Sequence, residues 1–263
     1  MKVTIHATGS RGNCASIEDK IIIDAGAKCN AIGEALFLTH MHTDHSKALK
    51  HFDGIPLYCT QETYDALKRT GKFAYLEPSI IEPNVKYRFD LSGEIFYVTA
   101  IRLKHDVSCV GYDIEHDGER IFFGTDFSEI IDDFDVRDYT EIFIECNNTL
   151  TISDMYAIDF DEEKPKDAFH RNRSYHNHCN INYLMSLFTR AGFSEDNPCD
   201  IPVTLLHRSS YYYWTNASRI EKLCNIANIV NPLVGATLCA DSLVNEEDTE
   251  HVVFRLAERY AKQ

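Results

Sequence analysis

The sequence predicts an α/β protein in which two β-sheets pack face to face and helices cover the outside. Three observations support this fold class. Short segments with strand character fill the first part of the chain, strand-like and helix-like segments alternate later, and several short apolar runs end in an ionisable side chain. With 263 residues and no internal repeat, low-complexity tract or proline-rich linker, residues 1–263 are expected to form one domain.

The first part of the chain is predicted to be mainly strand. Strands are expected at residues 3–7, 15–18, 21–23 and 35–39. Asn30–Glu34 is expected to form one helical turn before the last of these strands. Ser46–Phe52 is predicted to be a short helix with Ser46 as its N-cap, and residues 61–70 a second helix that Gly71 stops.

The later part is predicted to alternate between strands and helices. Strands are expected at residues 94–102, 108–115, 120–123 and 141–144, with Asp117-Gly118 as a hairpin turn. Then follow a helix at 180–191 ended by Gly192, a strand at 203–206, a helix at 216–226, a strand at 230–239 and a closing helix at 245–262.

Composition indicates a cytoplasmic protein without a membrane anchor. No apolar run approaches the length needed to cross a bilayer, and the start of the chain has no signal-peptide pattern. The nine cysteines contain no C-x-x-C pair, which predicts reduced thiols. A net charge of −15 argues against a protein that coats nucleic acid through its overall field, but it allows an enzyme that takes phosphate into a locally positive pocket.

The segment from His40 to His45 carries the chemistry that most constrains function. It contains His40, His42, Asp44 and His45, and it directly follows the apolar run 35–38. Imidazole and carboxylate groups are the usual ligands of zinc and also suit manganese or iron. Because this spacing offers too many ligands for one tetrahedral ion, we expect His40 and His42 to face one ion and Asp44 and His45 to face another. The alternative is a histidine-rich surface loop that binds no metal.

Four apolar runs end in an ionisable group, and such strand ends are where sites are commonly built. Besides the run before His40, these runs end in Asp126, Glu145 and His207. Asp126 is the predicted bridging ligand, although it could instead cap a turn. His105 is expected to complete the first metal site and His178 the second, with His176 as the competitor of His178.

On these residues the chain resembles the metallo-β-lactamase superfamily, whose fold is an αββα sandwich with a dinuclear metal site at one edge. The His40-x-His42-x-Asp44-His45 motif matches its signature. The features around His105 and the following Val110-Gly111-Tyr112 are similar to the phosphodiesterase branch, which includes tRNase Z-like and YycJ/WalJ-like enzymes. Further matches lie at residues 8–14, 23–26, 124–126, 178–180 and 205–209.

The resemblance implies a hydrolase that uses two divalent ions, zinc or manganese, to cleave phosphodiesters. Asp44 and His207 are the expected catalytic residues, with His207 donating a proton to the leaving oxygen or holding a phosphate oxygen. Asp24 and Glu145 are expected to orient imidazole ligands. Arg208, Ser209, Arg171 and Arg173 are the expected substrate contacts, although the basic segment 164–178 could instead be a solvated polar loop.

The substrate is left open between two classes. A nuclease acting on DNA or RNA is the first expectation, and a phosphodiesterase for small cyclic nucleotides, of the kind some phages use against defence signals, is the alternative. A metal-binding protein without catalysis is a third possibility, but the ligand set looks complete. The aromatic run 211–214 is expected to be core or subunit contact, which would allow a homodimer.

Overall fold

Two β-sheets form the centre of the molecule. The computed structural model describes residues 1–71, 77–149, 172–207 and 217–230. The first sheet has the spatial order β1 (Val3–Ala7), β2 (Cys14–Ile17), β3 (Ile21–Ile23), β4 (Ala35–Phe37), β5 (Leu57–Cys59) and β6 (Ser79–Ile80). The second has the order β11 (Glu129–Ile130), β8 (Glu94–Lys104), β9 (Cys109–His116), β10 (Glu119–Gly124), β12 (Glu141–Glu145), β13 (Cys199–Leu206) and β14 (Ala227–Ile229), and β7 (Lys86–Leu91) pairs with β8.

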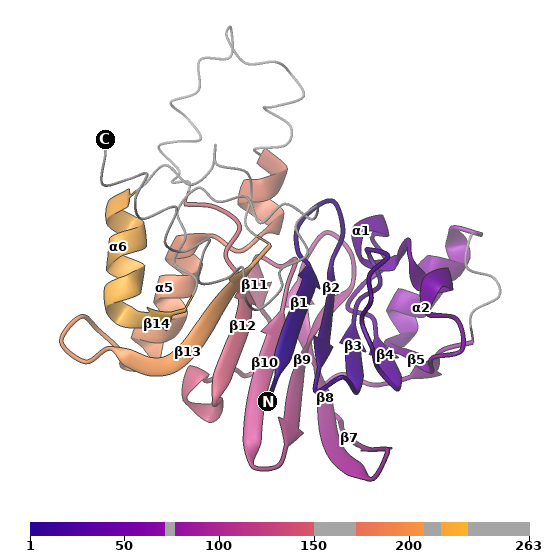
Figure 1. Cartoon of the computed structure of the whole chain (residues 1–263). Helices are drawn as coiled ribbons and strands as arrows, with labels where there is room; N and C mark the ends of the chain where they lie inside the picture. Colours follow the sequence, from indigo (N-terminus) through magenta and orange to yellow (C-terminus); the bar gives the residue numbers. More distant parts are fainter. Residues whose placement is uncertain (72–76, 150–171, 208–216, 231–263) are drawn as a thin grey trace, which may run out of the picture.

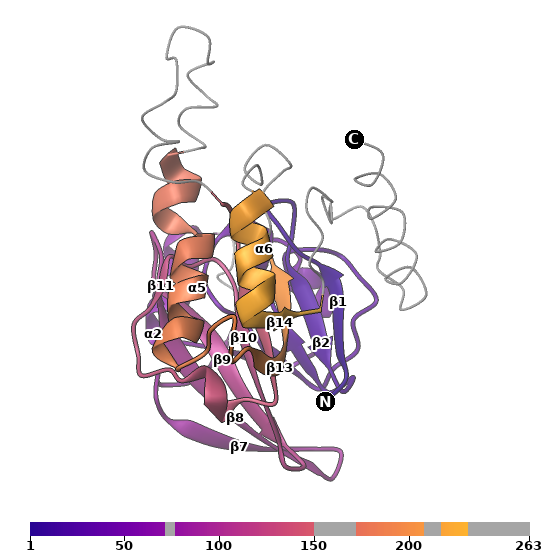
Figure 2. The same ribbon diagram turned by 90° about the vertical axis from the view of Figure 1, so that its left-hand side faces the viewer.

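Helices lie on the outer sides of both sheets (Figure 1). The short helix α1 (Thr43–Ser46), the 3-10 turn Leu49–Phe52 and α2 (Gln61–Arg69) accompany the first sheet, while α5 (Ile181–Arg190) and α6 (Ala217–Ile226) run side by side over the second (Figure 2). A second 3-10 turn spans Val136–Asp138, and residues 172–177 form a further helix. The predicted sandwich of two sheets with helices outside is therefore confirmed.

The hydrophobic core has three layers that follow from this arrangement. Between the sheets, buried side chains from both, among them Phe37, Phe96 and Tyr112, form one cluster. A second cluster joins the outer face of the second sheet to α5 and α6, and a third joins the first sheet to the segments around α1 and α2. Burial of this apolar surface is the main stabilising term, and it holds the strand ends rigidly relative to one another.

Parallel strand pairing brings distant parts of the chain to one edge. In the first sheet Ile23 of β3 pairs with Phe37 of β4. In the second sheet Gly124 of β10 pairs with Ile144 of β12, and Glu145 of β12 pairs with Leu206 of β13. Because parallel strands end at the same edge, the residues that follow them are neighbours in space.

Two local predictions are wrong. Asn30–Glu34 is not helical, because the amides of Glu34 and Ala35 both donate to the carbonyl of Lys20 and so tie the segment to the neighbouring loop. The single helix predicted over Ser46–Phe52 is instead two short pieces: α1, which ends at Ser46 and has His42 as its N-cap, and the 3-10 turn Leu49–Phe52. The Ser46 hydroxyl donates back to the carbonyl oxygens of Met41 (3.1 Å) and His42 (2.9 Å) instead of accepting from an amide.

Most other predictions agree with the structure in type and differ at their ends, but Val230, where a strand was predicted to begin, follows the unpredicted strand β14 and is not itself in a strand. Strands at residues 86–91 and 57–59 and the helix at 172–177 were not predicted, and that helix lies in the basic segment given above as a possible polar loop. The predicted closing helix 245–262 and all but the first residue of the predicted strand 230–239 lie outside the described residues. Within the described ranges the eight cysteines are free, and no helix there is long and apolar enough to span a membrane.

Candidate metal centre

The predicted ligands come from strand ends at one edge of the sandwich. His40 and His42 follow β4, and Asp44 and His45 lie in α1. The remaining groups each sit at or just after a strand of the second sheet or before α5: His105 after β8, Asp126 after β10, Glu145 at the end of β12, His178 before α5 and His207 after β13. The packing of the two sheets brings these segments together although the sequence separates them by up to 167 positions, from His40 to His207.

The backbone at this edge is held in unusual conformations. Asp24, Asp126 and His207 have φ values of 62°, 56° and 45°, in the left-handed region that L-residues seldom adopt. Such conformations persist where surrounding contacts over-determine them, and they cluster at functional sites. Gly26 allows the backbone of Asp44 to approach closely at this edge, because a Cβ atom at position 26 would lie only 1.5 Å from the carbonyl oxygen of Asp44.

Three groups of possible metal ligands lie side by side, and within each group the ligand atoms are no more than 4.8 Å apart. One group consists of His40, His42 and His105. A second consists of Asp44, His45, Asp126 and His207, and a third of Asp126, Glu145, His178 and His207. In this grouping His40 and His42 lie together, and Asp44 and His45 lie together.

Asp126 lies between the groups. Its Oδ2 atom is 3.3 Å from Nε2 of His45 and 4.0 Å from Nε2 of His40, and its Oδ1 atom is 3.2 Å from Nε2 of His207. Burial alone would raise the pKa of this carboxyl, but the adjacent His207 and His45 rings outweigh it and hold the pKa well below its usual range. The side chain is therefore an anion placed where a bridging ligand would be needed.

Most imidazoles of the site are oriented by a partner on Nδ1. The Nδ1 atom of His45 lies 2.7 Å from Oδ2 of Asp24. The same carboxylate accepts a hydrogen bond from the backbone amide of Thr39 through Oδ1 and one from the Thr39 hydroxyl through Oδ2. His105 Nδ1 lies 2.9 Å from the carbonyl oxygen of Asn177. Such partners fix the tautomer and direct Nε2 to the centre, as in many metal sites.

Glu145 is the Nδ1 partner of two imidazole rings, those of His178 and His207. Its Oε1 atom is 2.7 Å from Nδ1 of His178 and 3.2 Å from Nδ1 of His207, and these two rings stack with their centroids 5.0 Å apart. The other oxygen, Oε2, accepts from the amide of Phe127 at 2.7 Å. The structure thus brings Asp24 and Glu145 to the positions expected of groups that orient ligands.

The donor set fits divalent metal ions. In the described part of the chain, the buried side-chain atoms without a hydrogen-bond partner are Nε2 of His40 and Nε2 of His207, and both face this centre. Burying such a nitrogen without a partner is costly, and a metal ion would satisfy it. Burial holds the pKa of His40 well below its usual value, which keeps the ring in the neutral form that a metal requires.

The geometry of His178 and His207 differs from the expected one. His178 was expected to complete the second metal site and His207 to act on the substrate. In the structure the group that contains Asp44 and His45 is completed by His207, while His178 joins only the third group, beside Glu145. The signal available in the sequence was the run 203–206, which ends in His207 as the other strands end in their site residues.

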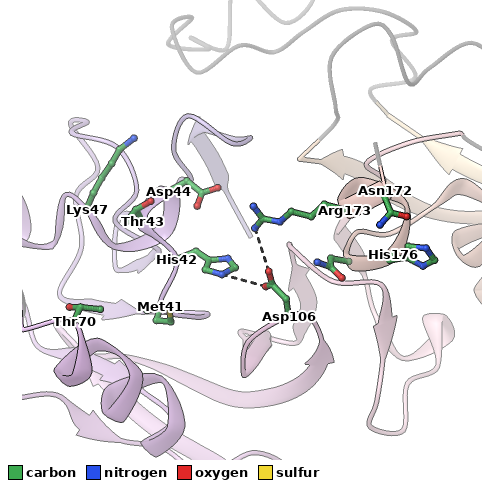
Figure 3. A pocket seen from close by; sticks show the side chains of 11 residues that line it. Met41, His42, Thr43, Asp44, Lys47, Thr70, Asp106, Asn172, Arg173 and His176 are labelled. Carbon is green, nitrogen blue, oxygen red and sulfur yellow. Dashed lines mark ion pairs between the residues drawn. The ribbon is translucent and has the colours of Figure 1, made fainter. Parts of the chain in front are cut away.

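A cavity of about 840 Å³ opens at the centre, and His42 and Asp44 form part of its wall. Its positive charge comes from Lys47 and Arg173, which lie on opposite sides of Asp44 in Figure 3. Arg173 is paired with Asp106 at 3.5 Å. Of the expected substrate contacts, the structure therefore brings Arg173 to the site, and Arg171, Arg208 and Ser209 lie outside the described residues. His176, the competitor of His178, lines the cavity.

Sequence reasoning missed two polar residues of the site. Asn13 places its side-chain nitrogen 2.8 Å from Nε2 of His45, and its backbone N–H donates to the carbonyl oxygen of Asp44 at 2.7 Å. Asp106 lies 3.1 Å from Nε2 of His105. Both could have been found by their neighbours, since Asn13 belongs to a glycine-rich motif and Asp106 follows a predicted ligand directly.

Comparisons with known proteins identify the family and agree with the fold. Residues 30–176 match the family described as Beta-lactamase superfamily domain. No curated protein sequence matches the chain. Solved structures with the same fold include Zn²⁺-bound PqqB from Methylobacterium extorquens, which is 13% identical with a TM-score of 0.57 and covers 88% of this chain and 97% of that one.

Two further structures are similar in fold. The short form of human tRNase Z is 17% identical with a TM-score of 0.50, covering 81% of this chain and 94% of that one. Unliganded yeast PDE1 is 11% identical with a TM-score of 0.56, covering 86% of this chain and 95% of that one. At these identities the likeness shows a common fold.

Proposed function

The chain belongs to the beta-lactamase superfamily domain family, and from this premise we propose that it is a metal-dependent phosphodiester hydrolase, in the first place a nuclease acting on DNA or RNA. The observation that carries the proposal is the position of the Asp126 carboxylate, whose Oδ2 atom lies 3.3 Å from Nε2 of His45 and 4.0 Å from Nε2 of His40. The buried Nε2 atoms of His40 and His207, which have no hydrogen-bond partner in the described part of the chain, lie at the same centre. A pair of adjacent ions is a device for hydrolysis of phosphate esters.

We assign the ligands from the geometry of the groups. His40, His42 and His105 would hold one ion, and Asp44, His45 and His207 the other. Asp126 belongs to the second group and lies 4.0 Å from Nε2 of His40 in the first, so we propose that it is shared between them. Zinc and manganese both accept this set of nitrogen and carboxylate ligands. When bound, such ions supply an activated water at neutral pH and offset the negative charge that develops around phosphorus.

The protein's own groups would position the substrate and move the proton. Because His207 belongs to the ligand group, His178 takes over the role of proton donor to the leaving oxygen in this proposal. It is held by Glu145 at 2.7 Å, lies beside the ring of His105 and follows Asn177, which lines the cavity. Arg173 would bind a phosphate oxygen at the mouth, where a guanidinium matches the phosphate geometry.

A nucleic-acid substrate is supported by Arg173, on the helix 172–177 beside the cavity, and by the likeness in fold to tRNase Z. A YycJ-like enzyme would use the site in this way. The second candidate is a cyclic-nucleotide phosphodiesterase. It is favoured by the net charge of −15, which repels long polyanions, and by a cavity of about 840 Å³, which suits a ligand of nucleotide size.

The test is hydrolysis with added Mn²⁺ or Zn²⁺, comparing a 5′-labelled oligonucleotide with the cyclic monophosphates of adenosine, guanosine, uridine and cytidine. Cleavage of the oligonucleotide alone supports the nuclease, and turnover of cyclic nucleotides alone supports the second candidate. His40→Ala should abolish either activity. His51→Ala is the matched control, because His51 bonds the carbonyl of Cys29 outside the ligand groups and should not alter turnover. Absence of both activities in protein shown to contain two ions would overturn the proposal.

A further inference from the structure

Asp106 occupies a position between the metal ligands and the cavity. Its Oδ1 atom lies 3.4 Å from Nε2 of His42 and 3.1 Å from Nε2 of His105. Its Oδ2 atom lies 3.5 Å from a guanidinium nitrogen of Arg173 (Figure 3). One carboxylate thus contacts two proposed ligands of the same ion through one oxygen and the guanidinium of Arg173, at the cavity wall, through the other.

The orientation of the rings indicates which nitrogen of His42 faces the ion. His105 directs Nδ1 to the carbonyl of Asn177, which leaves a lone pair on Nε2. That atom lies 3.3 Å from Nδ1 of His42. Two nitrogens that each bind a tetrahedral zinc ion at about 2.0–2.1 Å are separated by about 3.3 Å, so this pair has the spacing of two ligands. His42 would therefore bind through Nδ1 and turn its Nε2–H toward Asp106.

This arrangement completes a pattern. His45 is oriented by Asp24, His207 by Glu145, His105 by the carbonyl of Asn177, and Nδ1 of His40 lies 3.0 Å from the hydroxyl of Thr39. Among the described residues His42 would lack such a partner without Asp106. Moreover, Asp106 Oδ1 and the lone pair of His105 Nε2 repel each other, and a cation bound to His105 would convert this contact into an attractive one.

We propose that Asp106 is a positioning residue, which orients His42 for the first ion through Oδ1 and is itself anchored by Arg173 through Oδ2. This inference rests on the two-ion site of the proposed function. It also links the first ion to the cavity, because a substrate phosphate that binds Arg173 would compete with Asp106 for the same guanidinium.

The test measures metal binding directly. Zn²⁺ affinity is determined by competition with a chromophoric chelator, and the visible spectrum of the Co²⁺-substituted protein reports the ligand geometry. Asp106→Asn should bind one of the two ions about 10–100-fold more weakly and alter the Co²⁺ spectrum, with the other ion unaffected. Asp106→Glu keeps the charge and should recover part of the affinity.

Asp135→Asn is the matched control. Asp135 is also paired with an arginine, Arg137, and its side chain is 33% exposed compared with 35% for Asp106. The Asp135→Asn protein should bind both ions with wild-type affinity. The Zn²⁺ affinity of Arg173→Gln should lie between those of the wild type and Asp106→Asn, since Arg173 acts on the ion only through Asp106.

Wild-type affinity for both ions and an unchanged Co²⁺ spectrum in Asp106→Asn would overturn the inference, as would equal losses in Asp135→Asn. A larger loss in Arg173→Gln than in Asp106→Asn would overturn the anchoring role. These outcomes are separable from the proposed function, because a wild type that binds two ions but cleaves no phosphodiester contradicts only the activity.

Discussion

The Nδ1 atom of His45 lies 2.7 Å from the Oδ2 atom of Asp24, and both side chains are fully buried. Burial lowers the pKa of the imidazole, but the charges of Asp126 and Asp24 outweigh it and hold the pKa well above its usual value. In the metal-free protein His45 is therefore a cation between two carboxylates, and a metal ion on Nε2 would replace that proton while Asp24 keeps the ring in place.

Replacing Asp24 should weaken the second ion. Asp24→Asn keeps the shape of the side chain, and Asn tolerates the left-handed φ of 62° at this position. Because the ring of His45 loses its anionic partner, we expect about 10–100-fold lower affinity for one ion, measured by chelator competition. Asp19→Asn is the control, since Asp19 has a φ of 51° and is exposed. Equal affinities in the two variants would contradict the role of Asp24.

Asp126→Asn should reduce the binding of both ions, because this carboxylate lies 3.3 Å from Nε2 of His45 and 4.0 Å from Nε2 of His40. The metal content after dialysis, measured by mass spectrometry, is expected to fall from two ions per chain to fewer than one. Asp117→Asn, at the hairpin turn with a φ of 49°, should retain both. Loss of a single ion in Asp126→Asn would show that Asp126 serves one site only.

The stability of the metal-free protein should fall as the solution becomes alkaline. Burial lowers the pKa of His207, but the charges of Asp126 and Glu145 outweigh it and raise the pKa to about 9 from the ordinary 6.5. A raised pKa means that the folded state binds the proton more tightly than the unfolded state. The resulting stabilisation is complete below pH 6.5 and is lost as the pH rises through about 9, and it amounts to at most about 3 kcal/mol.

This effect can be followed by thermal unfolding between pH 6 and 10 in the presence of a chelator. His207→Gln should show a smaller decrease over the same range than the wild type. With metal bound the ring is already deprotonated, so the decrease assigned to His207 should disappear in the metal-loaded protein. A decrease of the same size in His207→Gln would mean that another group titrates.

Tyr112→Phe should lower the free energy of unfolding, because Tyr112 supports the backbone next to the ligand segment His40–His45. The buried hydroxyl of Tyr112 donates to the carbonyl of Leu38 at 2.7 Å, just before the ligand segment begins. Without it the carbonyl is left unsatisfied, which costs about 1–3 kcal/mol of the free energy of unfolding. Urea denaturation measures the loss. Tyr97→Phe, at a side chain that is 38% exposed, should change the free energy by less than about 0.5 kcal/mol.

Local pattern predicted those parts of the fold whose signal lies within a short window. The strand before His40 and the helix 61–69 have a clear apolar pattern and clear end signals, with Thr60 capping the helix and Gly71 at a φ of 68° after it. The helix at 172–177 was missed because its residues are mostly polar and show no apolar stripe. The start of α1 was missed because His42, which is not a typical cap, precedes it.

The sequence by itself determined the chemistry of the site. The ligand types and the spacing from His40 to His45 indicate a metal centre, and the polar ends of the strands before Asp126, Glu145 and His207 indicate where the other groups come from. These features are visible because each depends only on residues that are adjacent in the chain.

Only the tertiary structure decided how these groups are shared between sites. The parallel pairing of β12 with β13 and the placement of α5 set His207 with Asp44 and His45, and put His178 against Glu145 with its ring stacked on that of His207. Segments that follow β4 and β8 meet the helix 172–177 at the same edge, which sets Asp106 between His42 and Arg173. The reason is physical: a distance of 3 Å between side chains depends on the packing of whole sheets, and no short stretch of sequence contains that information.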